Sequence, residues 1–159
     1  MQAFETKICR PSDLAARILQ LPSPVIMTNG VFDILHRGHV TYLATARALG
    51  ASLVVAVNSD DSVRRLGKGD DRPLNHCEDR MAVLAALASV SLVVAFEEDT
   101  AVAVVAAVRP QIYVKGGDYD MRRIPEGQLV LSYGGQAIAI EFEHDRSTSK
   151  LLQKARHMI

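Results

Sequence analysis

A run of consecutive aliphatic residues, Leu53–Val57 (LVVAV), is the feature that most restricts how this chain can fold. A strand that is apolar at every position, and not at every second one, is buried on both of its faces. Similar apolar runs recur over 25–28, 92–96, 112–114 and 137–142, and helix-like segments separate them. This alternation predicts right-handed βαβ crossovers and a mainly parallel sheet with helices on both faces.

The intervening segments carry helix signals. Val40, Leu43, Ala44 and Ala48 recur at helical spacing, and Ser59 can cap a short helix through Leu66. A capping-box pattern, Asn75 with Glu78, opens another helix, and further helices are expected at 11–20, at 101–108 and from about 147 to 157. We predict one domain over 1–159 with a Rossmann-like, doubly wound α/β fold and five main strands. Within it, an N-terminal helix and linker over 1–23 precede an α/β core over 24–159.

The charge of the chain narrows the classes of partner. Eighteen basic residues balance eighteen acidic ones, so no global field attracts nucleic acid or an anionic membrane, and any phosphate binding must be local. No apolar run approaches the ~20 residues of a membrane span, and the N-terminus lacks the apolar core of a secretion signal. Cys9 and Cys77 have no metal-ligand spacing. We expect a cytoplasmic protein with reduced cysteines, no metal-ligating residues, and neither nucleic acid nor membrane as a partner.

The turns that follow the strands are the places to look for a site, because doubly wound sheets bind ligands beyond the carboxyl ends of their strands. These turns span 28–39, 58–60, 96–100 and 115–120, and neither GxGxxG nor GxxxxGK[ST] occurs in the chain. In the first turn, His36 and His39 flank Gly38 at a helix start, where free N–H groups attract anions. Imidazoles there can donate hydrogen bonds to phosphate oxygens in a transition state. A lone histidine would favour a surface or capping role, but a pair around a glycine favours function.

Three other segments suit ligand binding less specifically. Glycines in Lys115–Asp118 permit close approach of the backbone to a ligand, although a tight turn would also need them. Arg146–Ser149 opens the last helix as a second phosphate site, with plain N-capping as the alternative. Lys68 lies in a glycine-rich stretch that suits either a lid over phosphates or an ordinary solvated loop.

These motifs together resemble a known family. Thr28–Asp33 followed by His36–His39 is similar to the HxGH signature of the cytidylyltransferase-like nucleotidyltransferases. The chain also resembles one branch of that family, the heptose-phosphate adenylyltransferases, at residues 57–60, 72–73 and Arg80. The most specific marker of this branch is Val114–Tyr119 (VKGGDY). The likeness runs from about Pro24 to the C-terminal helix. Members of this branch occur alone or fused to a sugar kinase domain, and the chain is similar to the freestanding form.

The resemblance implies transfer of an adenylyl group from ATP to D-glycero-β-D-manno-heptose 1-phosphate, by direct in-line attack of the sugar phosphate on the α-phosphate. The products would be ADP-heptose, used for lipopolysaccharide or surface glycans, and pyrophosphate. Mg²⁺ bridging the triphosphate suits this chemistry, and family likeness suggests a homo-oligomer. Two alternatives stay open: a different nucleotide or acceptor, such as CTP with an alcohol phosphate, and a non-catalytic nucleotide-binding domain. The family's Arg-Thr-x-Gly-Ile-Ser-Thr segment is replaced here by Asp145–Ser149, which argues against glycerol-phosphate cytidylyl transfer.

The resemblance also assigns residues to roles. The expected catalytic residues are His36, His39 and Lys68. The expected nucleotide-binding residues are Thr28, Asn29, Gly30, Phe32, His36, His39, Arg80, Lys115, Gly116, Arg146, Ser147, Thr148 and Ser149. The expected acceptor-binding residues are Asp33, Asn58, Asp60, Gly117 and Asp118. Two of these have structural alternatives: Asp33 could be a turn carboxylate, and Arg80 an exposed helix arginine. Arg37, between the histidines, is expected to face solvent.

Overall fold

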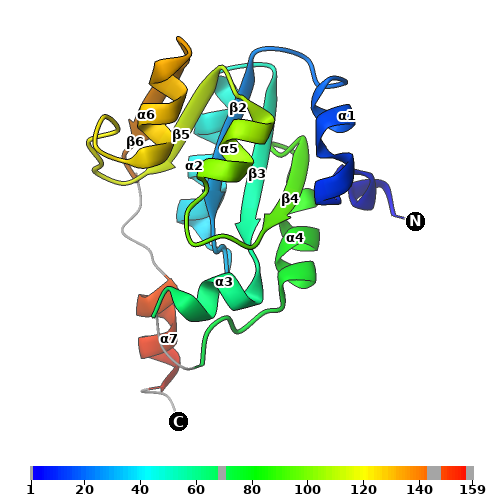
Figure 1. The fold of residues 1–159 in the computed structure, drawn as a ribbon. Coiled ribbons are helices and arrows are strands. Elements are labelled where there is room, and N and C mark those ends of the chain that lie inside the picture. Colours follow the sequence, from blue (N-terminus) through cyan, green and yellow to red (C-terminus); the bar gives the residue numbers. More distant parts are fainter. Residues whose placement is uncertain (1, 68–70, 143–147, 157–159) are drawn as a thin grey trace.

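The computed structural model describes residues 2–67, 71–142 and 148–156, which form one parallel sheet with helices on both faces (Figure 1). The strands are β1 (Ile8–Cys9), β2 (Val25–Gly30), β3 (Ser52–Asn58), β4 (Leu92–Phe96), β5 (Ile112–Gly116) and β6 (Gln136–Ile140). The α-helices are α1 (Leu14–Ile18), α2 (Arg37–Ala48), α3 (Asp60–Arg65), α4 (Cys77–Ala85), α5 (Val102–Val108), α6 (Pro125–Ser132) and α7 (Thr148–Arg156). Two 3₁₀ helices, η1 (Ala3–Lys7) and η2 (Pro11–Asp13), lie near the N-terminus.

The sheet confirms the predicted α/β class and corrects the expected number of strands. Within the described residues it has six strands in the order β1-β4-β3-β2-β5-β6, and every neighbouring pair is parallel. The additional strand, β1, pairs with Val93 and Val94 at the edge of the sheet. Two residues are too short to produce a recognisable apolar run. The segment 1–23 thus contributes an edge strand, and both Cys9 and Leu14 are buried in the core.

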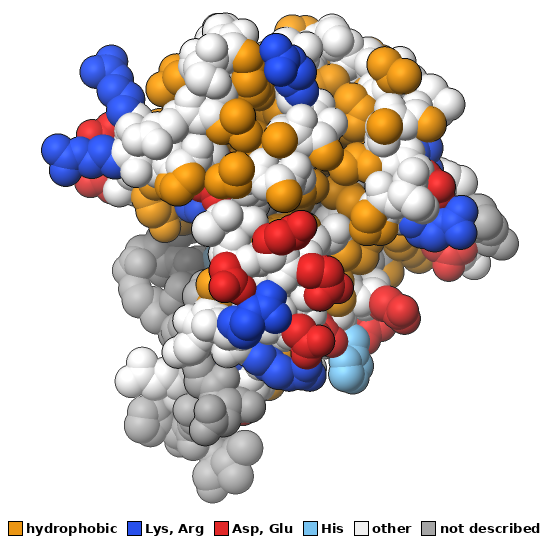
Figure 2. Space-filling view, viewed as in Figure 1, with side chains coloured by type: hydrophobic (Ala, Val, Ile, Leu, Met, Phe, Trp, Pro, Cys, Tyr) orange, Lys and Arg blue, Asp and Glu red, His pale blue; other side chains and the backbone are white. Residues whose placement is uncertain are grey.

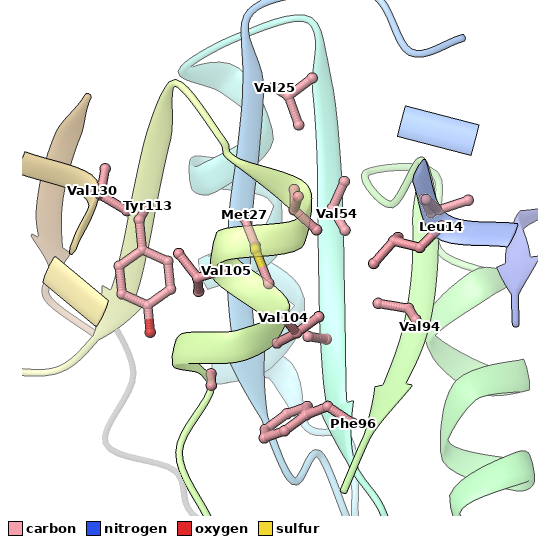
Figure 3. Packing of buried hydrophobic residues seen from close by; sticks show 14 of the residues in the cluster. Leu14, Val25, Met27, Val54, Val94, Phe96, Val104, Val105, Tyr113 and Val130 are labelled. Atoms are coloured by element: carbon pink, nitrogen blue, oxygen red, sulfur yellow. The ribbon is translucent and has the colours of Figure 1, made fainter. Parts of the chain in front are cut away.

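The central strands bury both faces, as the run Leu53–Val57 predicts. Along β2 and β3 successive residues alternate between two apolar clusters, so that Met27 and Val54 enter one cluster while Ile26 and Val55 enter the other. The first cluster includes residues of α1, α5 and α6 and is shown in Figure 3. The second includes residues of α2 and α4. Each face is therefore closed by its own layer of helices.

The helix caps and helix bounds predicted from local sequence signals agree only partly with the structure. Ser59 caps α3 as expected, because its hydroxyl accepts the Ser62 N–H at 3.1 Å. The capping box at Asn75 is wrong: His76 is the N-cap residue of α4, and the Asn75 amide instead donates to the backbone oxygen of Asp33. A tertiary acceptor has displaced the local one. The expected helix over 11–20 is a 3₁₀ turn followed by the short α1, and α6, which begins at Pro125, was not anticipated.

The strand order places a crevice between β2 and β5. From β2 the chain passes through α2 to β3 and then β4 in one direction, and α5 then returns it to β5 on the opposite side of β2. Figure 1 shows α5 in front of the sheet and α2 behind it. Helices that leave in opposite directions open a crevice at the carboxyl ends of these strands, where ligands of such sheets bind. No helix among the described residues is long and apolar enough to cross a membrane.

Candidate active site

A cavity of about 410 Å³ lies at the carboxyl ends of the strands, and its size is typical of small-molecule sites. The residues that line it are Asn29, Gly30, Val31, Phe32, His39, Tyr42, Asn58, Leu66, Phe96, Asp99, Thr100, Ala101, Lys115, Gly116, Tyr119, Glu126 and Phe142. All four strand-to-helix turns singled out in the sequence contribute to this lining. The crevice at the switch point is therefore a formed site.

The surface near this site carries no single sign of charge. Figure 2 shows acidic and basic side chains interspersed over the region of α3, below a more apolar part of the molecule. Several are paired, including Arg64 with Asp61 and Arg65 with Asp99. A balanced surface agrees with the formal charge of zero, so attraction of phosphate falls to the groups at the cavity itself.

The two motif histidines lie together at the start of α2. His36 is the extended N-cap residue, and its ring stacks on that of His39 with 3.9 Å between the ring centroids. His39 lines the cavity and contacts the Phe32 ring edge-on, with 5.3 Å between the two ring centroids. Phe32 adopts a left-handed backbone conformation (φ 50°), which residues other than glycine rarely adopt, so the turn bends sharply here. Arg37 is exposed, as expected.

Both imidazoles are held in the neutral form. Burial, followed by the neighbouring His36 ring, lowers the pKa of His39 from 6.5 to about 4, although a backbone hydrogen bond with Ile34 opposes the shift. Burial also lowers the pKa of His36. A neutral imidazole has a single N–H, and that of His39 is engaged by the backbone of Ile34. An anion bound beside the ring would raise its pKa again and so favour a second N–H donor. The pair is suited to donating hydrogen bonds to phosphate.

Two buried tyrosines fix the last residues of β2. The hydroxyls of Thr28 and Tyr42 share a hydrogen bond of 2.6 Å, and the Tyr113 hydroxyl donates to Asn29 Oδ1 at 2.5 Å. Burial raises the pKa of both phenols, so both stay protonated. Thr28, expected to bind the nucleotide, is buried and has its hydroxyl bonded to Tyr42 within the core. Neither tyrosine was identified from the sequence, because each lies in a stretch that reads as ordinary core.

Asp33 anchors the chain between α3 and α4 to the first turn. Its side chain is 1% exposed, and its carboxylate accepts the N–H groups of Leu74 and Asn75 at 2.9 Å each. Arg72 Nε lies 3.1 Å from the same carboxylate. These contacts engage both sides of the carboxylate within the turn, and Asp33 does not line the cavity.

Arg80 ties three segments together. Its fully buried guanidinium donates to the backbone oxygens of Val31 at 2.7 Å and Asn75 at 3.0 Å, and to the Asp60 carboxylate at 2.8 Å. Burial tends to raise the pKa of Asp60, but hydrogen bonds from Arg80 and His76 outweigh it and lower that pKa. The alternative of an exposed helix arginine is wrong. Arg80 and Asp60 support the wall of the cavity and do not line it.

The turns after β4 and β5 complete the walls. Glu126, at the start of α6, accepts the N–H of Ala101 at 2.9 Å and so joins the beginnings of α5 and α6. A Cβ on Gly116 would lie 2.5 Å from the tip of the Phe142 ring, so a larger residue there would require that exposed ring to move. Lys115 Nζ lies 5.4 Å from the centre of the Tyr119 ring, within reach of a cation–π contact.

The cavity therefore unites some predicted residues and not others. From the nucleotide-binding prediction it brings together Asn29, Gly30, Phe32, His39, Lys115 and Gly116, and from the acceptor prediction Asn58. Gly117 and Asp118 follow directly but do not line it. Lys68, Arg146 and Ser147, and the side chains of Thr148 and Ser149, lie outside the described part of the structure. Tyr42, Glu126 and Phe142 line it without a sequence signal that pointed to them.

The residues that the structure describes include no candidate metal-binding cluster. No group of three or more His, Cys, Asp or Glu side chains is arranged there to hold an ion. The carboxylates that line the cavity are Asp99 and Glu126. A cation at this site would take most of its ligands from a bound phosphate and from water, which is how Mg²⁺ usually binds.

Exchange of Arg80 for lysine tests its role in the wall. Lysine keeps the charge but cannot reach three separate oxygens, so we expect Arg80→Lys to lower the free energy of unfolding by about 2 kcal/mol. The matched control is Arg64→Lys, whose exposed pair with Asp61 should contribute less than about 0.5 kcal/mol. Urea denaturation measures both values, and equal losses would contradict the role of Arg80.

The pKa of His39 predicts that its protonation opposes folding. Because the unfolded chain takes up this proton at 6.5 and the folded chain only at about 4, stability falls as the pH is lowered through that window. We expect the unfolding free energy of the wild type to fall more steeply than that of His39→Asn, by up to about 1.4 kcal/mol per pH unit. Urea denaturation between pH 7 and pH 4 measures the difference, and parallel pH profiles would refute it.

Comparison with known proteins supplies the family. Residues 27–153 match the cytidylyltransferase-like family. The chain is 58% identical to a D-beta-D-heptose 1-phosphate adenylyltransferase of Bordetella bronchiseptica, with 96% of each chain covered. It is 56% identical to the bifunctional protein HldE of Shewanella amazonensis, where 84% of the chain matches 28% of that protein.

Solved structures agree with this assignment. A lipopolysaccharide core biosynthesis protein from Thermoplasma volcanium superimposes with a TM-score of 0.62 at 30% identity, covering 77% of this chain and 98% of that one. A pantoate-beta-alanine ligase from Francisella tularensis has a TM-score of 0.61 at 12% identity, covering 89% and 68%, and so shares the fold alone. With the family match extending over most of its length, the chain belongs to the cytidylyltransferase-like family.

Proposed function

We propose that this protein transfers the adenylyl group of ATP to D-glycero-β-D-manno-heptose 1-phosphate, with ADP-heptose and pyrophosphate as products. One observation carries the proposal: the stacked, neutral pair His36 and His39 stands at a helix start beside a cavity at the switch point of the sheet. The choice of adenylyl group and heptose draws support from the 58% identity with the Bordetella adenylyltransferase.

The chemistry needs donors and positioning more than a base. An anionic oxygen of the sugar phosphate attacks the α-phosphorus, the bond from that phosphorus to the bridging oxygen breaks, and pyrophosphate leaves with the electron pair. No proton has to be removed from the attacking oxygen, so catalysis consists of alignment and charge neutralisation. His39 donates through the N–H that its ring gains when the bound phosphate raises its pKa, and the free N–H groups of the first turn of α2 reinforce it. Mg²⁺ carried by the triphosphate would neutralise further charge.

We assign different parts of the substrates to different sides of the cavity. We assign the phosphates to the side formed by Asn29, Gly30, His36 and His39, with Phe32 closing the turn. The nucleoside lies towards Lys115 and Gly116, next to the exposed rings of Tyr119 and Phe142. Asn58, on the β3 side, is left for the acceptor. Gly117 and Asp118, Lys68 and the segment Arg146–Ser149 remain proposed contacts from family resemblance, while Asp33, Asp60 and Arg80 act by holding the walls.

Pyrophosphate release tests the proposal directly. The purified protein is incubated with Mg²⁺, either ATP or CTP, and either the heptose 1-phosphate or an alcohol phosphate. Release with ATP and the heptose phosphate is the expected result. Release only with CTP would reject adenylyl transfer in favour of cytidylyl transfer, and release with no pair would leave a nucleotide-binding domain without this activity. We further propose that residues 1–159 form one catalytic domain. We also propose that the protein acts in the cytoplasm as a homo-oligomer.

His39→Ala separates catalysis from binding. Because the imidazole is assigned to the charge that develops in the transition state, its loss should lower kcat about 10²-fold or more while the Kd for ATP changes little. His76→Ala is the matched control, since His76 is 82% exposed and does not line the cavity, and its kcat should stay within about two-fold of the wild type. Steady-state kinetics and calorimetry supply both quantities. An unchanged kcat in His39→Ala would return this histidine to a structural role.

A further inference from the structure

The contact between Tyr113 and Asn29 has a direction that matters for the cavity. Tyr113 is fully buried in β5, within the cluster that contains Val105 and Val130. In Figure 3 its hydroxyl points along the sheet towards the end at which Phe96 lies, which is the carboxyl edge. There it donates to Oδ1 of Asn29 at 2.5 Å. A core side chain thus reaches the lining of the site.

This hydrogen bond decides which end of the Asn29 amide faces the cavity. A carboxamide has an acceptor oxygen and an NH₂ group with two donors. Asn29 is the hydrogen-bond partner of Tyr113 among the residues that the structure describes. If the amide were reversed, the buried phenolic hydrogen would lose its acceptor, and unsatisfied buried donors are costly. Burial, followed by the nearby Glu126 carboxylate, raises the pKa of Tyr113, so the phenol keeps that hydrogen at neutral pH.

The NH₂ group of Asn29 is consequently free for a ligand. Its carbonyl is engaged on the core side, Asn29 lines the cavity, and its Nδ2 atom has no hydrogen-bond partner among the described residues. A group that offers donors and no acceptor favours an anionic oxygen. His39 lines the same cavity at the start of α2, where free backbone N–H groups also favour an anion, so these donors suit one kind of ligand group.

We propose that Tyr113 is a positioning residue that fixes the Asn29 amide with its Nδ2 donor directed at a phosphate oxygen of the bound nucleotide. This inference rests on the proposed function for the identity of the nucleotide. It goes beyond that function because Tyr113 does not line the cavity, yet it sets the orientation of Asn29, which does. Tyr113 acts without touching the ligand, and the bond to Asn29 transmits its effect.

Tyr113→Phe removes the hydroxyl and little else. The freed amide can then rotate, so we expect the Kd for ATP to rise about three- to ten-fold, as for loss of one hydrogen bond, while the Kd for adenosine is unchanged. The matched control is Tyr133→Phe, because the Tyr133 hydroxyl donates to the Pro110 oxygen at 2.9 Å and does not line this cavity. It should leave both dissociation constants as in the wild type. Calorimetry at a temperature where thermal unfolding shows every variant to be folded gives these values.

A double-mutant cycle separates positioning from a general structural effect. Asn29→Ala should weaken ATP binding at least as much as Tyr113→Phe, and combining the two should weaken it no further. Asn29→Asp, which still accepts from Tyr113 but presents an anionic oxygen, should weaken it more than either. Additive losses in the cycle, an unchanged Kd for ATP in Tyr113→Phe, or an equal loss for adenosine would each overturn the proposal. Wild-type protein that binds ATP but releases no pyrophosphate would refute the proposed function and leave this binding test intact.

Discussion

The turn that follows β2 is held in place by buried charge, and the rest of the site depends on it. Asp33 binds the backbone of residues 74 and 75, while Arg80 binds the backbone of Val31 and the carboxylate of Asp60. Buried ion pairs add little net stability because desolvation offsets their attraction, but removing one partner leaves an uncompensated charge. Their value here is geometric. They fix the turn from which Phe32 and His39 enter the cavity.

The electrostatics of the site follow from burial and not from the net charge of the protein. The chain as a whole is neutral, and its charged side chains near α3 are interspersed and partly paired. Burial keeps His36 and His39 uncharged, and the neighbouring His36 ring adds to the shift at His39, so the free site avoids two adjacent cations. The free backbone N–H groups at the helix start hold phosphate by hydrogen bonds, and an incoming anion would raise the pKa values of the two histidines and so add donors. The site is ready for an anion without depending on a wide positive field.

Much of the fold could be predicted from local patterns. The run Leu53–Val57 is apolar at every position because helices cover both faces of the sheet, and the same logic located four further strands. Strand β1 was missed because it has only two residues, and α6 was missed because it begins at Pro125 in a stretch whose apolar pattern was weak. Asn75 showed how a good local signal can fail, since its amide is bound by a residue forty-two positions away. Tertiary partners outweigh local ones when both compete for the same group.

The sequence by itself determined the sheet class, the four turns at its carboxyl edge and the histidine pair, because periodicity and short motifs are written in neighbouring residues. Only the tertiary structure placed Asp33, Asp60 and Arg80, which resemble site residues in the sequence, in ion pairs beside the cavity and outside its lining. It alone also joined Tyr113 to Asn29, eighty-four positions apart. The orientation of a polar side chain is set by whichever partner the fold places against it, and adjacent residues in the sequence carry no record of that partner.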